Sequence, residues 1–176
     1  MLIAHLPAGY VTSKLLFARL RAPGAAFRPF LCAGLLGAVA PDMDKVYLYL
    51  ADDMRHQHHT LWPHFPIVWT GALLVSLIWF HTARSSTPAA LAVIFAINGL
   101  LHMVLDTVVG EIWWLAPFVD RPFSLFTIPA RHHPWWLSDM LHWTFTFELA
   151  IVAWAIYLWR RSPKSGQAGS APECNP

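Results

Sequence analysis

Long apolar stretches dominate the hydropathy pattern of the chain, and three of them approach the length of a membrane crossing. A transmembrane helix needs about 20 mostly apolar residues. Residues 89–109 and 140–159 have this length, and residues 65–80 form a shorter but almost purely apolar stretch. The pattern therefore predicts a spanning helix in each of these three segments.

Two further apolar segments come earlier in the chain, and both are irregular. Residues 30–50 have the length of a span, but Pro41 and three charged residues interrupt them. Proline lacks the N–H group that continues a helix, so a break is predicted at Pro41. Residues 8–20 are too short to span and predict an amphipathic helix or half-helix at the membrane surface.

These segments together predict an all-α integral membrane bundle of about four transmembrane helices plus the short N-terminal helix. The bundle occupies residues 1–161, and four crossings place both termini on one side of the membrane. Residues 162–176 are rich in Ser, Gly and Pro and predict a disordered cytoplasmic tail.

The composition favours a membrane protein over a soluble one. Of the 176 residues, 56% are hydrophobic and only 12% are charged, whereas soluble domains carry about a quarter of charged residues. The net charge of +2 does not indicate nucleic-acid binding. The cysteines, Cys32 and Cys174, do not form the pattern of a disulfide framework.

The basic residues predict which side of the bundle faces the cytoplasm. Eight lie on the side that carries the termini, and four lie on the other side. Cytoplasmic segments carry an excess of Lys and Arg, so the first side is predicted to be cytoplasmic. The first set is Lys14, Arg19, Arg21, Arg28, Arg84, Arg160, Arg161 and Lys164, and the second is Lys45, Arg55, Arg121 and Arg131.

His102 and Asp106 are the most informative polar pair inside an apolar segment. They lie four residues apart, so both side chains project from one face of a helix, and Asn98 extends that face by one turn. A charged residue in the middle of a span costs roughly 2.5–3.5 kcal/mol, so Asp106 needs a partner. That partner is either a bound cation or a histidine in an internal hydrogen bond.

Asp42 and Asp44 form a second polar cluster at the predicted helix break. Broken helices at membrane depth normally line a cavity or a site. Two carboxylates so close together repel each other unless a cation or protons lie between them. The alternative is a solvated loop at the membrane surface, which their position inside an apolar run disfavours.

A third cluster contains four histidines within residues 56–64, and imidazole is a good ligand for zinc, manganese or iron. His59 and His64 flank a turn just before a predicted span and are the favoured ligands. The others, His56 and His58, fit a wet interfacial loop. Whether these two or the later His132, His133 and His142 join a site stays open at this point.

The predicted topology brings these three clusters to one depth. Asp42 and Asp44 lie in the outer half of the first span, His64 lies where the second begins, and Asp106 lies in the outer half of the third. Unrelated structural residues seldom converge in this way. The convergence predicts a metal site near the outer leaflet.

Motifs around these residues resemble a known family. The matching positions are His5, residues 37–44 (Gly-Ala-Val-Ala-Pro-Asp-Met-Asp), His59 and His64 with their spacing, His102 with Asp106, and Gly110. They resemble the family of membrane-bound, metal-dependent hydrolases of bacterial inner membranes, some of which are under SOS-repressor control. The likeness covers about residues 1–118. Val39 replaces a leucine of the family pattern, and the arginine, glycine and threonine between the two histidines are replaced.

The resemblance implies a metal-dependent hydrolase of the bacterial inner membrane, multi-pass, with both termini cytoplasmic. A divalent ion, zinc before manganese or iron, would be held by Asp42, Asp44, His59, His64, His102 and Asp106, with His5 closing the site. The catalytic candidates are Asp42 and Asp44, one of which would accept a proton. The residue order also resembles, more faintly, soluble zinc-dependent phospholipases C and nucleases. A lipid-like or phosphoester substrate is therefore expected.

Two other classes of function remain open from the sequence. Intramembrane Asp and His are equally typical of a transporter or channel for metal ions or protons. Such a protein should carry polar residues through to its cytoplasmic side, and here the inner halves hold few besides Glu148. A non-enzymatic membrane scaffold, in which the histidines and carboxylates satisfy one another, is the third reading.

Overall fold

The structure is a computed structural model that describes residues 1–21, 24–51, 59, 61–83, 86–129 and 131–162. The described chain is all-helical, as predicted, with one isolated β-bridge between Ile112 and Phe123. The α-helices are α1 (His5–Leu20), α2 (Phe27–Val39), α3 (Met43–Ala51), α4 (Pro66–Thr82), α5 (Thr87–Asp106), α6 (Trp135–Leu141) and α7 (Phe145–Arg160), with short 3-10 helices η1 (Ala40–Asp42) and η3 (Trp62–His64). The predicted tail, residues 162–176, lies almost entirely outside the described residues.

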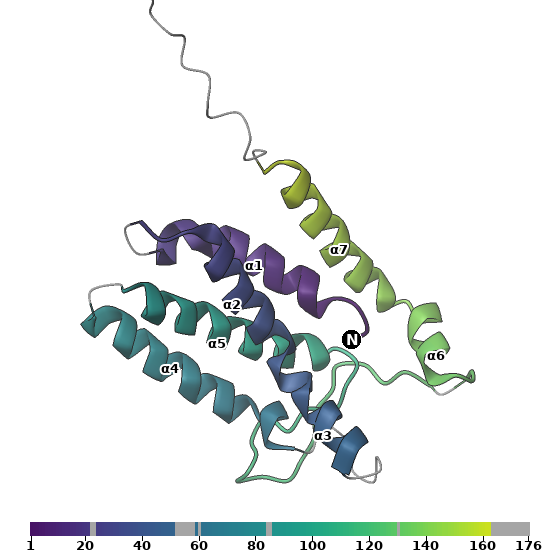
Figure 1. Ribbon diagram of the computed structural model, residues 1–176. Coiled ribbons are helices and arrows are strands. Elements are labelled where there is room, and N and C mark those ends of the chain that lie inside the picture. Colours follow the sequence, from purple (N-terminus) through teal and green to yellow (C-terminus); the bar gives the residue numbers. More distant parts are fainter. Residues whose placement is uncertain (22–23, 52–58, 60, 84–85, 130, 163–176) are drawn as a thin grey trace, which may run out of the picture.

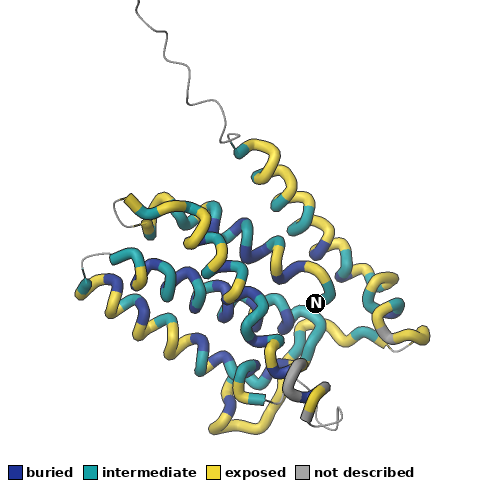
Figure 2. The backbone as a smooth tube through the Cα atoms, viewed as in Figure 1, coloured by how far each residue is buried: buried dark blue, intermediate teal, exposed yellow. Residues whose placement is uncertain are grey.

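Helix α5 is the centre of the bundle. It packs between α2 and α4, while α1 covers α2 and α7 lies against α1 (Figure 1). Burial follows this order, because α5 is buried along much of its length while α7 is largely exposed (Figure 2). An apolar cluster that includes Phe30, Phe80, Val93 and Ile94 fills the end of the bundle away from η1.

A close approach of α2 to α5 depends on a glycine. A Cβ atom added at Gly37 would lie 2.1 Å from the backbone carbonyl oxygen of Phe95 on α5. Because that neighbour is backbone, it cannot turn aside as a flexible side chain would. Gly37 therefore sets the distance between the two helices and hence the place of the η1 turn that follows α2.

The predicted break in residues 30–50 is confirmed. Helix α2 ends at Val39, Pro41 lies in η1, and α3 begins at Met43. The N-terminal helix, in contrast, is longer than predicted: it begins at His5 rather than residue 8 and has 16 residues. It runs along α2 as a full member of the bundle, because its small residues Ala8 and Gly9 allow close packing.

The predicted span over residues 140–159 is wrong at its start. Helix α6 ends at Leu141, His142 is extended, and α7 begins only at Phe145. The His142 ring bonds the hydroxyl of Thr144 at 2.8 Å, a local side-chain contact that competes with helical geometry.

Among the described helices, α5 is long and apolar enough to cross a membrane, and α4 is apolar but has 17 residues. A buried core helix has the same composition, so helix length alone does not establish four crossings. That both termini lie on one side of the membrane stays a prediction, since the described chain ends at residue 162. Met1 lies beside Asp106 at the end of α5, whereas α7 runs away from that end (Figure 1).

Gly37→Ala should lower the stability of the protein by about 1–3 kcal/mol, because the new methyl group forces α2 away from α5. Thermal unfolding in detergent, followed by circular dichroism, measures the change. Gly71→Ala on α4 is the matched control, since nothing lies within 4 Å of a Cβ atom there. Alanine favours a helix over glycine, so this control should be neutral or slightly stabilising. Equal melting temperatures for both variants would contradict the proposed α2–α5 constraint.

Candidate metal centre

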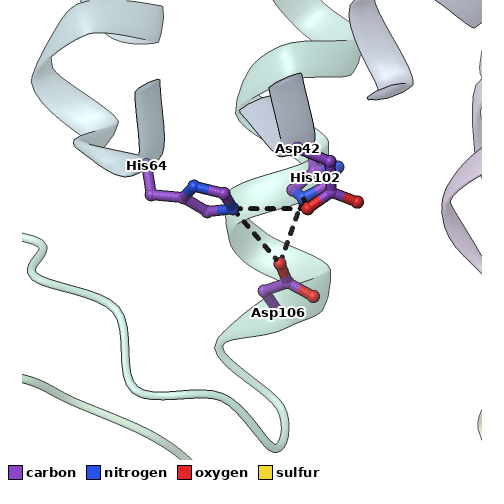
Figure 3. Close-up of side chains that lie close together, drawn as sticks. All are labelled: Asp42, His64, His102 and Asp106. Carbon is purple, nitrogen blue, oxygen red and sulfur yellow. Dashed lines mark ion pairs between the residues drawn. The ribbon is translucent and has the colours of Figure 1, made fainter. Parts of the chain in front are cut away.

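Four of the predicted residues converge at one end of the bundle. Asp42, His64, His102 and Asp106 each offer one ligand atom, and these four atoms all lie within 4.8 Å of one another. The side chains point toward a common centre from three separate parts of the chain (Figure 3). Three of the four residues are buried, and Asp42 is half-buried.

The local sequence explains how each ligand is presented. Asp42 is the last residue of η1 and His64 is the last residue of η3, and a proline directly precedes each of them. Proline suits the first turn of a helix, where its missing N–H is not needed. The two turns contact each other, so both ligands face α5. On α5, the spacing of four residues places His102 and Asp106 on one face, as predicted.

Four distances between histidine nitrogens and carboxylate oxygens of the centre lie within about 0.5 Å of the value expected around a tetrahedral zinc ion. Nε2 of His102 lies 3.0 Å from Oδ2 of Asp106 and 3.5 Å from Oδ1 of Asp42. Nε2 of His64 lies 3.6 Å from Oδ1 of Asp42 and 3.9 Å from Oδ2 of Asp106. Ligand atoms about 2.0–2.1 Å from a tetrahedral zinc lie about 3.4 Å from one another.

The two histidines are oriented by their outer nitrogens. Nδ1 of His102 donates to the carbonyl oxygen of Ala38 at 2.7 Å, and Nδ1 of His64 donates to Oδ2 of Asp44 at 2.7 Å. Carbonyl and carboxylate oxygens only accept, so the Nδ1 atoms must carry the hydrogens. The lone pair of a neutral ring then lies on Nε2, which points at the centre. Metal-ligating histidines show the same arrangement.

The remaining predicted residues surround these four. Asp44 holds His64, as above. Nε2 of His59 lies 3.6 Å from Oδ2 of Asp106, and Nε2 of His5 lies 3.0 Å from Oδ1 of the same carboxylate. The His5 ring also stacks on His102, with ring centroids 3.7 Å apart. All seven predicted residues therefore gather in one place, four at the centre and three in contact with it.

Gly110 has a packing role beside the centre. A Cβ atom added there would lie 2.7 Å from Cε1 of His59. The absence of a side chain lets the His59 ring approach the end of α5. Close packing of the His59 ring thus explains why a glycine follows the last motif of the sequence.

The electrostatic balance of the centre favours a cation. Three carboxylates, those of Asp42, Asp44 and Asp106, lie among the histidines, and Lys45 pairs with Asp42 at 2.7 Å on the exposed side. Burial lowers the pKa of His64, which precedes α4, but hydrogen bonds to Asp42 and Asp44 outweigh it and raise the net pKa above its ordinary value. The carboxylates therefore stabilise positive charge at this point.

Glu148 is the functional residue that sequence reasoning placed incompletely. The sequence counted it among the few polar residues of the inner halves, but its carboxylate accepts hydrogen bonds from the backbone N–H groups of Leu2, Ile3 and Ala4 at 2.6–3.1 Å. It is the buried residue of the otherwise exposed α7. These bonds hold the segment that leads directly into His5. The sequence showed a charged residue inside an apolar helix, but it did not show which groups that residue would bond.

The other histidines do not lie at this centre as far as the structure describes them. His132 and His133 are exposed, and His132 and His142 line a separate pocket of about 260 Å³. His56 and His58 lie outside the described residues.

The chain matches a known protein family. The profile of a family described as YdjM inner membrane protein matches residues 1–164, which is most of the chain. No curated protein and no solved structure matches the chain significantly.

Glu148→Gln should loosen the segment before α1, because the amide keeps one acceptor oxygen and turns an N–H donor toward backbone N–H groups. We expect a loss of about 1–3 kcal/mol in stability and faster hydrogen exchange at Leu2, Ile3 and Ala4. Glu111→Gln, in an exposed loop, is the control and should change neither quantity. Unchanged exchange in Glu148→Gln would show that these hydrogen bonds do not hold the segment.

Proposed function

This chain belongs to the YdjM inner membrane protein family, and from that premise we propose that it is a membrane-embedded, metal-dependent hydrolase. The observation that carries the proposal is the convergence of Asp42, His64, His102 and Asp106, whose ligand atoms all lie within 4.8 Å of one another in the interior of the protein. Zinc fits a set of two imidazoles and two carboxylates, and manganese or iron would accept the same ligands.

A buried polar atom supports the fit of a metal to these residues. Nε2 of His102 is buried, and among the described residues it has no hydrogen bond of acceptable geometry. Buried polar atoms in native proteins usually have a partner, and a bound ion is one such partner. The donor set is also chemically suitable, since both rings are held by their Nδ1 atoms with Nε2 left to bind.

When bound, a divalent ion at this place supplies Lewis acidity and a water of lowered pKa, which suit hydrolysis. The exposed fractions of the side chains indicate which residue a substrate can reach. The Asp42 side chain is 28% exposed, whereas those of His64, His102 and Asp106 are 0–3% exposed. Access to the centre is therefore from the side of Asp42. Oδ1 of Asp42 is the oxygen that faces His64 and His102, so we assign its other oxygen, Oδ2, to accept the proton, and Asp44 to orient His64.

The position of the centre supports a substrate that arrives from the membrane. Arg19 lies in the last turn of α1, Arg28 lies in the first turn of α2, and Arg160 ends α7. These basic ends lie away from the metal centre (Figure 1). We propose that they face the cytoplasm and that the centre lies near the outer leaflet, with α1, α2, α4, α5 and α7 crossing the bilayer. A lipid-like substrate can then reach Asp42 without leaving the membrane, and phosphoesters are the first class to test.

A transporter or channel is the rival, and the buried face of α5 disfavours it. A conducting path needs polar groups along its whole length. Beyond Asn98, the buried residues of α5 toward its start are Ala96, Ile94, Val93, Ala90 and Ala89. Metal flux into vesicles that contain the purified protein separates the two classes, because a hydrolase gives no flux.

The wild-type protein, purified in detergent, should contain a stoichiometric divalent metal by elemental mass spectrometry. Asp106→Ala should abolish it, and so should the double variant Asp42→Ala/His102→Ala, because each removes central ligands. The matched control is His132→Ala/His133→Ala, which changes two exposed histidines elsewhere. Circular dichroism and gel filtration establish that each variant is folded. A folded Asp106→Ala protein with full metal content would contradict the assignment of Asp106 as a metal ligand.

Asp44→Asn should weaken metal binding without removing a central ligand, since it weakens the hydrogen bond that orients His64. Loss of such an outer partner typically costs about 10–100-fold in metal affinity. Competition with a chelator of known affinity measures the change. Asp120→Asn is the control, because Asp120 accepts a hydrogen bond from Trp113 in an exposed loop. An unchanged affinity in Asp44→Asn would contradict the orienting role.

A further inference from the structure

A large apolar cavity lies beside the metal centre. Its volume is about 750 Å³, within the range of small-molecule sites. It is bounded by the η1–α3 segment, by η3, and by the facing sides of α4 and α5. Its described lining residues include Ala40, Met43, Asp44, Pro63, Trp69 and Phe95.

The cavity and the metal centre share their walls. Ala40 and Met43 flank the Pro41–Asp42 pair in the chain, and Pro63 directly precedes His64. Asp44 belongs to both places, because it lines the cavity and holds the His64 ring through Oδ2. A molecule in the cavity would therefore lie one residue away from two of the four central ligands.

The wall formed by Trp69 is fixed and presents an apolar surface. Its indole N–H donates to the carbonyl oxygen of Pro63 at 2.7 Å, so its polar group is satisfied within the protein. Its ring packs directly against Gly99 of α5, where a Cβ atom would lie only 1.9 Å from the ring. Phe95 lies against the same ring, with centroids 5.6 Å apart.

Asp44 is the charged residue among the described lining residues, and one of its oxygens lacks a partner. The residue is 3% exposed, and its Oδ1 makes no hydrogen bond to any described residue. A buried carboxylate oxygen is an acceptor, so a hydrogen-bond donor from a ligand would satisfy it.

We propose that this cavity binds the alkyl chain of an amphiphile, with a hydrogen-bond-donating head group, such as a hydroxyl, against Asp44. The apolar walls suit the chain, and Asp44, the charged residue among the described lining residues, selects the donor. The inference deepens the proposed function, and it rests on that function only for the statement that the amphiphile is the substrate. The head group then lies beside His64, so the bond to be hydrolysed lies close to the alkyl chain.

The test uses a photoreactive monoacylglycerol that carries a diazirine in its acyl chain. The full-length protein is reconstituted in phosphatidylcholine vesicles, irradiated with the probe, and digested for mass spectrometry. Adducts should concentrate on residues 61–72 and 95, and unlabelled monoacylglycerol should compete for them. An alkane of equal chain length lacks the donor and should compete about tenfold less well.

Two variants distinguish labelling inside the cavity from labelling of the lipid-exposed surface. Ala72→Trp fills the cavity and should reduce labelling there about tenfold, since a few lost methylene contacts suffice for that change. Leu74→Trp, on an exposed face of the same helix, should leave labelling unchanged. Equal labelling in both variants, equal competition by the alkane, or adducts spread evenly over exposed apolar residues would overturn the proposal.

Metal content of the same samples keeps this inference distinct from the proposed function. Labelling of the cavity in a protein that contains no metal would support the alkyl-chain site and contradict the proposed hydrolase function. Full metal content without labelling of the cavity would overturn the alkyl-chain site and leave the hydrolase standing.

Discussion

The carboxylate of Asp106 is a negative charge at the buried end of an apolar bundle, and the arrangement of that end follows from the need to compensate it. Burying an unpaired charge is very costly. Here Oδ2 lies 3.0 Å from His102, and Oδ1 lies 3.0 Å from His5 and 2.7 Å from the amino group of Met1. His64 and His59 approach at 3.9 and 3.6 Å. Segments far apart in sequence must therefore meet at one point.

Helix packing makes this meeting possible. The contact of Gly37 with the backbone of α5 brings the end of α2 close, and the break at Pro41 turns Asp42 toward His102. Glu148 acts in a similar way from α7, by fixing the backbone that leads into His5. Each of these features is a local departure from an ideal apolar helix, and each places a polar group at the centre.

The resulting centre is asymmetric in a way that suits chemistry on a membrane-borne molecule. Asp42 is its accessible ligand, and Asp44 connects it to an apolar cavity of about 750 Å³. The rest of α5 toward its start is buried against apolar side chains. Among the described buried residues of α5 from Ala89 to Ala96 none is polar, as the proposed hydrolase requires.

The sequence alone determined the helical class, the break at Pro41 and the residues of the centre, because these depend on local rules. Apolar length, the missing proline N–H and the spacing of His102 and Asp106 all act within one segment. Tertiary structure decided the rest. That Asp44 orients His64, that Glu148 binds residues 2–4, and that α1 runs the length of α2 depend on contacts between distant segments. Hydropathy shows that a buried charge needs a partner, but only packing chooses which one.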